Sequence, residues 1–290
     1  MKRILTGAAL MLAAVSAWAL QPFVHADAKV AGGGVKAAMA AAEQKLTGAG
    51  FTVVGKHQPQ GIPSHGVIVV TDNGLTDALK AVGGTAVVGV PIRVGVKSDG
   101  TVSYVNPEYW GRAYLRKNYG KAEGAYKAVA GKLQTAFGAG KPFGGEVDTD
   151  DLSSYRYMFG MERFDDRATI KDWGNFDAAV KAVHDNLGKG VAGLSKVYEI
   201  VYADKKLAVF GVAMNDPKAG EGYWMGKING AEHIAALPWE VFVVDGKVMA
   251  LHGRFRTALA FPSLTMGQFM AIGDHPDSTL KMMEDVAGVK

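Results

Sequence analysis

Apolar and polar positions along the chain follow two periods, and the same order of periods occurs twice. Runs with apolar residues at every second position predict strands, and runs with apolar residues three or four apart predict helices. The first occurrence predicts a helix, two strands, a helix, a hairpin and a closing helix, over residues 35–46, 51–57, 66–71, 74–82, 91–106 and 124–137.

The second occurrence repeats this order. Its first helix is predicted at 175–187, with Asn175 as N-cap and Gly188 as the stop, because an asparagine side chain accepts a hydrogen bond from the free amides of a first helical turn. Two strands, a helical stretch, a hairpin and a closing helix follow over residues 196–202, 207–214, 230–237, 238–256 and 277–286.

The two hairpins show the closest correspondence. Pro91 matches Pro238, Asn106 matches His252, and each hairpin has Asp-Gly between two β-rich runs. Asp-Gly favours a two-residue turn because both central residues need a positive φ. Strands joined by tight turns pair antiparallel. The sequence therefore predicts an α+β protein of two similar domains, each a small, mostly antiparallel sheet with helices packed on one face.

Four segments follow from these patterns. Residues 1–26 are predicted to be a signal peptide, and residues 27–140 the first α+β repeat domain. Residues 141–152 are glycine-rich and then acidic, which indicates a linker. Residues 153–290 form the predicted second repeat domain.

The signal peptide is indicated by Lys2 and Arg3, an apolar run from Ile4 to Leu20, and small residues before a cleavage site. Cleavage after Ala26 fits the pattern best, and cleavage after Ala19 is the alternative. We therefore expect export to the periplasm, with no stable membrane insertion after cleavage.

Composition narrows the possible partners. The chain carries 32 basic and 28 acidic residues, and loss of Lys2 and Arg3 leaves 30 and 28, a net charge of +2. A nearly neutral mature protein gives little electrostatic reason to expect nucleic acid or an anionic membrane as partner. The chain has no cysteine, which excludes disulfides, thiolate metal sites and covalently attached haem.

The segment ALHGRFRTALAF, residues 250–261, carries the strongest candidate chemistry. As the second strand of its hairpin, it places His252, Arg254 and Arg256 on one face. A two-residue turn puts Trp239 directly across from His252. The face is apolar near the turn and cationic at its far end, and arginine with histidine and tryptophan can grip a carboxylate or another oxyanion.

If the first hairpin also has a two-residue turn at its Asp-Gly, Arg93 pairs with Asn106, and Arg112 falls near the position of Arg256. Each copy therefore offers an arginine-bearing element at the same end of its sheet. Two uses are open for these cations: recognition of an anionic ligand, or salt bridges at the domain interface, for instance with Glu162 or Asp165.

The aromatic run that follows the first hairpin also has two interpretations. In PEYWGRAY, Tyr109 and Trp110 depart from strand alternation just after Pro107. They form either the lip of a pocket or a plug between the two domains.

The histidines suggest one weak metal site. His57 and His65 flank a loop between two strands, so their rings are able to approach one another and hold copper or haem. His184 and His233 lie in helical patterns and are expected on helix surfaces, and His275 precedes a proline at a helix start. The spacing of these residues identifies no cofactor.

The segment from Gly50 to Tyr114 resembles the domain-of-unknown-function 302 family, in GFTVVGKH, GVIVV and PIRVGV…VSYVNPEYWGRAYL. Asn106-Pro107 falls where such domains commonly carry Asn-Pro. Family members often have a cysteine just before that asparagine, where this chain has Val105, so the resemblance implies no thiol chemistry here. The second copy has His252-Gly253 at the equivalent place. The resemblance implies a compact α+β domain, often exported in bacteria, with no established activity.

These observations predict an exported, non-catalytic protein that binds a small ligand or a protein partner near the interface of its two domains. No Gly-x-Ser-x-Gly elbow or phosphate-binding loop occurs in the sequence. Two alternatives stay open: a protein that handles metal or haem, and an enzyme in which His252 and neighbouring arginines perform acid-base chemistry on a small anion.

Overall fold

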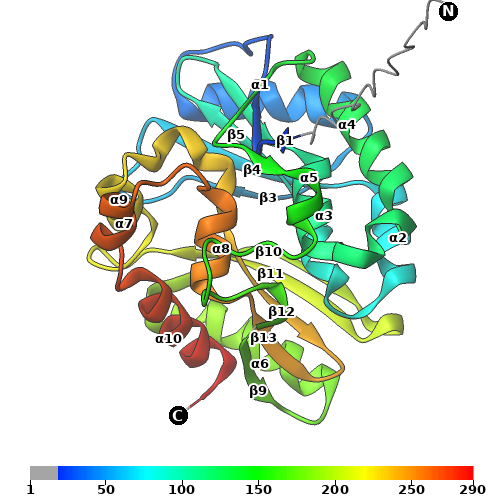
Figure 1. Cartoon of the computed structure of the whole chain (residues 1–290), viewed down its shortest axis with the longest axis vertical. Helices are drawn as coiled ribbons and strands as arrows, with labels where there is room; N and C mark the ends of the chain where they lie inside the picture. The colour runs from blue at the N-terminus through cyan, green and yellow to red at the C-terminus, as the bar shows by residue number, and fades with distance from the viewer. Residues whose placement is uncertain (1–18, 167, 290) are drawn as a thin grey trace, which may run out of the picture.

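The computed structural model describes residues 19–166 and 168–289, which form two large antiparallel sheets and one two-stranded sheet, with helices outside them (Figure 1). The first sheet has the strand order β3-β4-β5-β6-β2-β7, and the second has the order β10-β11-β12-β13-β9. Every strand pairing among the described residues is antiparallel. The predicted α+β class with two sheet-based halves is confirmed.

The first half, residues 19–152, holds the six-stranded sheet and the two-stranded sheet, which its first and last strands form. Its strands are β1 (Ala19–Leu20), β2 (Phe23–His25), β3 (Thr52–His57), β4 (His65–Thr71), β5 (Ile92–Lys97), β6 (Val102–Val105), β7 (Lys141–Phe143) and β8 (Val147–Asp148). Its helical segments are α1 (Val35–Gly48), α2 (Asn73–Val82), η1 (Gly84–Gly89), α3 (Pro107–Leu115), η2 (Arg116–Lys121), α4 (Glu123–Phe137) and α5 (Thr149–Leu152).

The second half, described from residue 153 to 289 except residue 167, holds the five-stranded sheet. Its strands are β9 (Ala168–Asp172), β10 (Leu194–Tyr202), β11 (Leu207–Met214), β12 (Trp239–Val244) and β13 (Lys247–Ala250). Its helical segments are η3 (Phe164–Asp166), α6 (Phe176–Gly188), η4 (Val191–Gly193), η5 (Ala203–Lys205), α7 (Glu221–Lys227), η6 (Gly230–Ala236), α8 (Gly253–Ala260), α9 (Met266–Ala271) and α10 (His275–Ala287).

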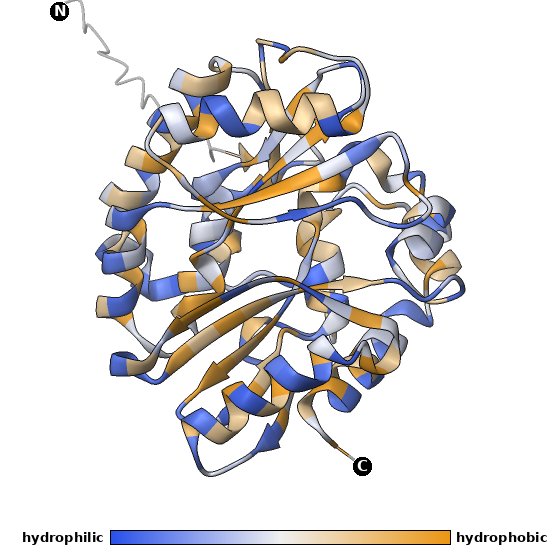
Figure 2. Ribbon diagram, turned by 180° about the vertical axis from the view of Figure 1, so that it is seen from behind, coloured by the Kyte–Doolittle hydropathy of each residue, from blue (hydrophilic) through white to orange (hydrophobic). Residues whose placement is uncertain are grey.

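The two halves pack reciprocally. Helix α1 covers the outer face of the first sheet and α6 that of the second, at opposite ends of the molecule in Figure 1. Between the sheets, η1 of the first half contacts β11 and β12, and η6 of the second half contacts β4 and β5. Each sheet is therefore covered on both faces, which is why β4 and β11 are almost continuously apolar and buried (Figure 2).

The sheets approach each other most closely along the edge strands β3 and β10. Each strand carries a bulge, between Val53 and Gly55 in β3 and between Lys196 and Tyr198 in β10. A Cβ atom on Gly55 would lie 2.6 Å from the carbonyl oxygen of Val197, so glycine is required where the two edges meet. This close contact joins the halves into one body.

The second hairpin has the predicted register, and the first does not. Val244 pairs with Lys247 across a two-residue Asp-Gly turn, as expected. In the first hairpin Val96 pairs with Val102, which leaves a longer turn and shifts the register by one residue. The predicted pairing of Arg93 with Asn106 is therefore wrong.

The predicted strand through His252, Arg254 and Arg256 is also wrong. Strand β13 ends at Ala250, and the chain turns at His252 into helix α8. The segment combines a two-residue alternation of polar side chains with apolar residues at helical spacing, Phe255 and Leu259 among them, and both of these are buried in the helix. Packing of α8 against α10 favours the helix.

The boundaries predicted around the first domain need two corrections. Residues 141–152 are not a free linker, because β7 and β8 pair with β2 and β1. A signal-peptide boundary after Ala26 does not fit the fold, because β2 lies between β6 and β7 and Phe23 is fully buried. Cleavage after Ala19 keeps this strand. The remainder of the predicted signal peptide, residues 1–18, lies outside the described residues.

Candidate functional site

Two arginines and one glutamate meet between the two sheets. Arg93 on β5 donates through Nη1 to Oε1 of Glu240 on β12, and Arg256 on α8 donates through Nε to Glu240 Oε2 at 3.2 Å. Backbone carbonyls of η6 accept the other bonds: Arg93 Nε donates to Ala235 at 3.1 Å and Arg256 Nη2 to Ala236 at 2.7 Å. We call these three ions the Arg–Glu–Arg cluster.

Trp110 packs against both guanidinium groups of the cluster. The Cζ atoms of Arg93 and Arg256 lie 4.7 and 4.8 Å from its ring centroid, and Arg256 also lies 5.6 Å from the ring of Trp239. Trp110 Nε1 donates to the carbonyl of Pro22 at 2.8 Å, which ties the start of the described chain to the interface. Four predicted site residues, Arg93, Trp110, Trp239 and Arg256, are thus brought together.

The cluster is sealed from solvent. Arg93 and Arg256 are each 1% exposed and Glu240 is 3% exposed. Buried ions require complete pairing, because loss of solvation is costly unless hydrogen bonds replace it. This arrangement joins the halves and presents no surface to a ligand. The salt-bridge interpretation therefore describes these arginines better than open anion recognition.

The other predicted residues of the cationic segment lie at the surface. Arg254 Nη1 donates to Glu162 Oε1 at 2.9 Å, and His252 Nε2 lies 3.5 Å from the same oxygen. Glu162 is thus the partner expected for these cations, but within the second half. Asp165 instead pairs with Arg116. Because Arg254 already neutralises Glu162, the carboxylate beside His252 is held in a surface ion pair.

The remaining first-half candidates support the backbone. Asn106 is the N-cap of α3, where its Oδ1 accepts from Glu108 N and its Nδ2 donates to Gln21 O. Tyr109 Oη donates to Leu259 O at 2.9 Å across the interface. Arg112 pairs with Glu108 on its own helix, away from the position of Arg256. Tyr109 and Trp110 therefore act as the predicted interdomain plug.

The two histidines proposed as metal ligands have separate partners. His57 Nε2 forms a buried hydrogen bond with the carboxylate of Glu221 between β3 and α7, and burial raises the pKa of Glu221 despite His57. His65 Nδ1 lies 2.9 Å from Ser64 Oγ. In the described part of the chain, no group of three or more histidine or acidic residues is arranged to hold a metal ion.

Several residues that matter were not singled out by sequence reasoning. Glu240 and Glu221 stand in apolar surroundings, and His25 fell within the predicted signal peptide. His233, expected on a helix surface, is instead packed against the rings of Phe23, Phe143 and Phe261. One signal was present for Glu240: Pro91-Ile-Arg and Pro238-Trp-Glu place opposite charges at equivalent positions.

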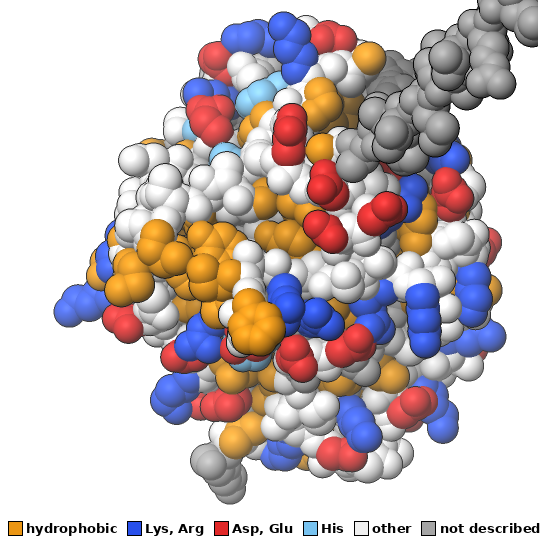
Figure 3. Space-filling view, viewed as in Figure 1, with side chains coloured by type: hydrophobic (Ala, Val, Ile, Leu, Met, Phe, Trp, Pro, Cys, Tyr) orange, Lys and Arg blue, Asp and Glu red, His pale blue; other side chains and the backbone are white. Residues whose placement is uncertain are grey.

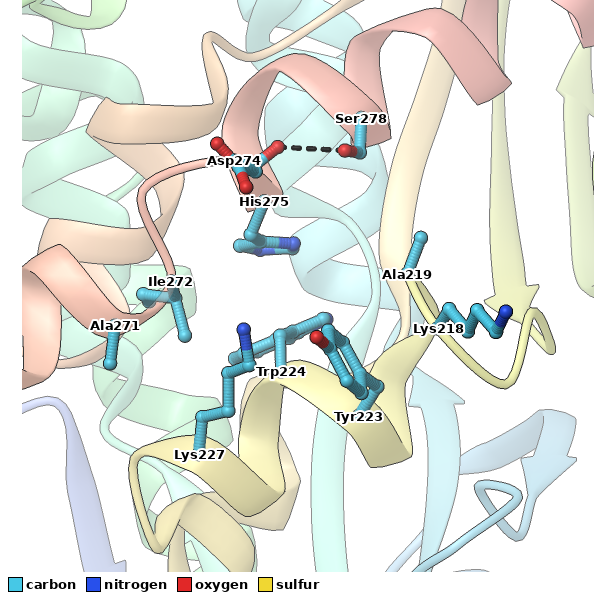
Figure 4. Close-up of a pocket in the computed structure, with 10 residues that line it drawn as sticks. All are labelled: Lys218, Ala219, Tyr223, Trp224, Lys227, Ala271, Ile272, Asp274, His275 and Ser278. Atoms are coloured by element: carbon cyan, nitrogen blue, oxygen red, sulfur yellow. Dashed lines mark hydrogen bonds between the residues drawn. The ribbon is translucent and has the colours of Figure 1, made fainter.

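A cavity of about 160 Å³ opens between α7 and the start of α10 (Figure 4). We call it the Trp224 pocket. It is lined by Lys218, Ala219, Tyr223, Trp224, Lys227, Ala271, Ile272, Asp274, His275 and Ser278. Exposed Tyr223, Met266 and Met270 add apolar surface on α7 and α9, where Figure 3 shows a group of hydrophobic side chains.

Stacked rings form one wall of the Trp224 pocket. His275 stacks on Trp224 with 4.2 Å between ring centroids, and its ring meets Trp239 edge-on at 5.0 Å. His275 Nδ1 lies 3.1 Å from Thr279 Oγ1. Two buried ring nitrogens, His275 Nε2 and Trp224 Nε1, have no hydrogen-bond partner among the residues that the structure describes. Such unsatisfied groups at a cavity wall are candidates for ligand contacts.

The charges of this pocket come from residues other than His275. Burial lowers the pKa of His275 to about 3, so its ring is neutral at neutral pH and is a poor general base there. Lys218, Lys227 and Asp274 leave the lining with one net positive charge. Ser278 Oγ donates to the Asp274 carbonyl at 2.8 Å, with no contact to a base that would activate it. The arrangement favours binding over catalysis.

Comparison with protein-family models, curated proteins and solved structures finds no match to this chain. The resemblance to the domain-of-unknown-function 302 family therefore stays a prediction from its residues. Within residues 19–166 and 168–289, no helix is long and apolar enough to cross a membrane.

Proposed function

We propose that this chain is an exported, non-catalytic protein of two duplicated domains that binds a small molecule in the Trp224 pocket, beside the interface between its halves. One observation carries the proposal: His275 and Trp224 line a cavity, and one buried ring nitrogen of each, Nε2 and Nε1, has no hydrogen-bond partner among the described residues. Both nitrogens lie behind the cavity wall, so a ligand supplies the hydrogen bonds that they lack once the rings turn toward it.

The sealed interface supports this location. The Arg–Glu–Arg cluster holds the two halves in fixed positions, so Trp239 presents a rigid ring to His275. A rigid wall lowers the entropy lost on binding, because few side chains need to be ordered. The first half has Ile92 at the position of Trp239, directly after its proline, so it lacks this aromatic wall.

The proposal is tested on protein purified from its native compartment. Native mass spectrometry is expected to show an additional mass that is lost on denaturation, and a thermal-shift screen of small molecules is expected to identify compounds that compete with it. The Trp224→Phe variant keeps an aromatic ring but removes the N–H group with the rest of the indole, so it should bind the same compounds about 10-fold more weakly.

Trp173→Phe is the matched control, because Trp173 is 36% exposed and lies outside the lining of the pocket. It should bind as the unmodified protein does. If no mass co-purifies and no compound in the screen binds, or if Trp173→Phe and Trp224→Phe weaken binding equally, the proposal is wrong.

A further inference from the structure

We infer that the ligand of the Trp224 pocket is a small aromatic carboxylate with a single ring. The inference rests on the proposed function and adds the chemical class of the ligand. It follows from the size of the pocket, from the residues of its walls and from the direction of its two lysines.

Size limits the ligand to one ring. The cavity measures about 160 Å³. Cavities of about 150 Å³ in protein interiors take up benzene. Ligand sites for drug-sized molecules are larger, about 300 Å³ or more. A nucleotide or an oligosaccharide would therefore exceed the space, and a benzene ring with one small substituent fills it.

The walls favour a flat ring. Tyr223 and Trp224 lie side by side on α7, and Ala219, Ala271 and Ile272 complete an apolar surface. His275 already stacks on Trp224, and the interplanar angle is 23°. A planar ligand makes offset or edge contacts with these rings that a puckered aliphatic ring cannot match.

The polar groups favour a carboxylate. Figure 4 shows Lys227 pointing from α7 toward the start of α10, whereas Lys218 extends away from the facing rings. Lys227 Nζ lies 4.4 Å from the ring centroid of Tyr223, and no carboxylate among the described residues forms an ion pair with it. The indole Nε1–H of Trp224 is a donor only, so the ligand must supply an acceptor.

A carboxylate meets the charge requirement as the structure stands, because its oxygens pair with Lys227, and they also accept from Trp224 Nε1 once the indole turns toward the cavity. Phosphate fits less well. The lining contains no arginine, the residue that grips phosphate through two parallel hydrogen bonds. Asp274 also lines the pocket and would repel a doubly charged group more strongly than a singly charged one.

The test uses three probes of nearly equal size: benzoate, its neutral analogue benzamide, and the non-planar cyclohexanecarboxylate. Binding is measured by titration calorimetry and by quenching of tryptophan fluorescence. We expect benzoate to bind at least about 10-fold more tightly than either analogue, a difference of the size that one charged contact or one ring contact supplies.

Two lysine variants locate the charge. Lys227→Met should weaken benzoate binding about 10-fold and leave benzamide binding unchanged, because only the charged contact is lost. Lys218→Met also removes one positive charge, but the Lys218 side chain points away from the facing rings of the pocket. This change should therefore alter benzoate binding less than about threefold. Both lysines are exposed, so neither change disturbs the core.

Benzamide binding as tightly as benzoate, or equal losses for Lys218→Met and Lys227→Met, would overturn the assignment of a carboxylate. Equal binding of cyclohexanecarboxylate would overturn the aromatic ring. If none of the three probes binds while the native protein still carries a ligand mass, the ligand class is wrong and the proposed function stands. If no ligand is found at all, both are wrong.

Discussion

Glu240 contacts two buried guanidinium groups, so its carboxylate compensates two cations that have no access to solvent. Its two oxygens receive Arg93 and Arg256 separately. Arg93 and Glu240 occupy equivalent positions in the two hairpins, since each stands two residues after a proline, and their side chains carry opposite charges. A single neutral substitution therefore tests how far the interface depends on this pairing.

We expect Glu240→Gln to lower the free energy of unfolding by about 3–5 kcal/mol, because it leaves two buried arginines without a carboxylate. Urea unfolding followed by circular dichroism measures the change. Glu43→Gln is the control, since Glu43 pairs with Lys56 at the surface and its loss should cost less than about 1 kcal/mol. Similar unfolding midpoints for the two variants would contradict the importance of the cluster.

His275 makes stability depend on pH. Burial lowers its pKa from 6.5 to about 3, so the unfolded chain takes up a proton before the folded protein does. Its contribution is therefore fully present above pH 6.5 and is lost progressively as the pH falls toward 3. Between pH 6.5 and pH 5.0 this one group should reduce the free energy of unfolding by about 2 kcal/mol.

The His275→Phe variant keeps a ring against Trp224 and removes the titration. Urea unfolding at pH 7.5 and pH 5.0 should show a loss about 2 kcal/mol smaller in this variant than in the unmodified protein. His233, whose pKa burial lowers to about 4, is present in both proteins and its effect cancels. An identical pH dependence in the two proteins would show that His275 is not sealed.

Strand β2 bears on the predicted cleavage of a signal peptide. It occupies the same place in the first sheet that β9 occupies in the second, beside β6 and β13 respectively. Residues on both sides of the strand are also held. The backbone N–H of Ala26 donates to Val102 O, and the side chain of Asn106 donates to Gln21 O. The element is part of the sheet, and a mature chain without it would leave β7 without a partner and β6 paired on one side only.

We therefore expect the secreted protein to begin at Leu20, as read by intact mass and N-terminal sequencing. A chain that begins at Asp27 should lose at least about 3–5 kcal/mol of stability relative to one that begins at Leu20, because it lacks the fully buried Phe23 as well as the strand. Equal stability of the two chains, or a mature terminus at Asp27, would contradict the position of β2.

Elements with a single dominant period were predicted well, and elements with two competing periods were not. Helix α6 begins at Phe176, with Asn175 accepting from Ala178 N as its N-cap, as expected. Helix α8 was predicted as a strand because its polar residues alternate. The competing helical period is selected by packing against α10, a contact that no local pattern reveals.

The two halves are expected to unfold together. Each lends a 3₁₀ segment to the sheet of the other, η1 to the second and η6 to the first, and the Arg–Glu–Arg cluster lies between them. Separation would expose the inner faces of both sheets and three buried ions at once. Such an interface couples the halves more strongly than ordinary contacts between domains.

Calorimetry should therefore show one transition, with the calorimetric enthalpy equal to the van't Hoff enthalpy. Glu240→Gln should lower its midpoint, and residues 20–152 or 153–290 expressed alone should not show the cooperative transition of the full chain. Two resolved transitions in the unmodified protein would show that the halves are independent.

Local pattern was sufficient for the α+β class, for the antiparallel hairpins and for helices α1, α2, α4, α6 and α10, because a two-residue or 3.6-residue period is a property of neighbouring positions. It also identified four of the residues that meet between the sheets. Tertiary structure decided which charges pair and where the Trp224 pocket opens. It also sealed the cluster from solvent and placed β2 in the first sheet. Arg93 and Glu240 are 147 positions apart, and Trp224 and His275 come from different helices. Their contacts depend on how the two halves pack, which the sequence period of either half does not specify.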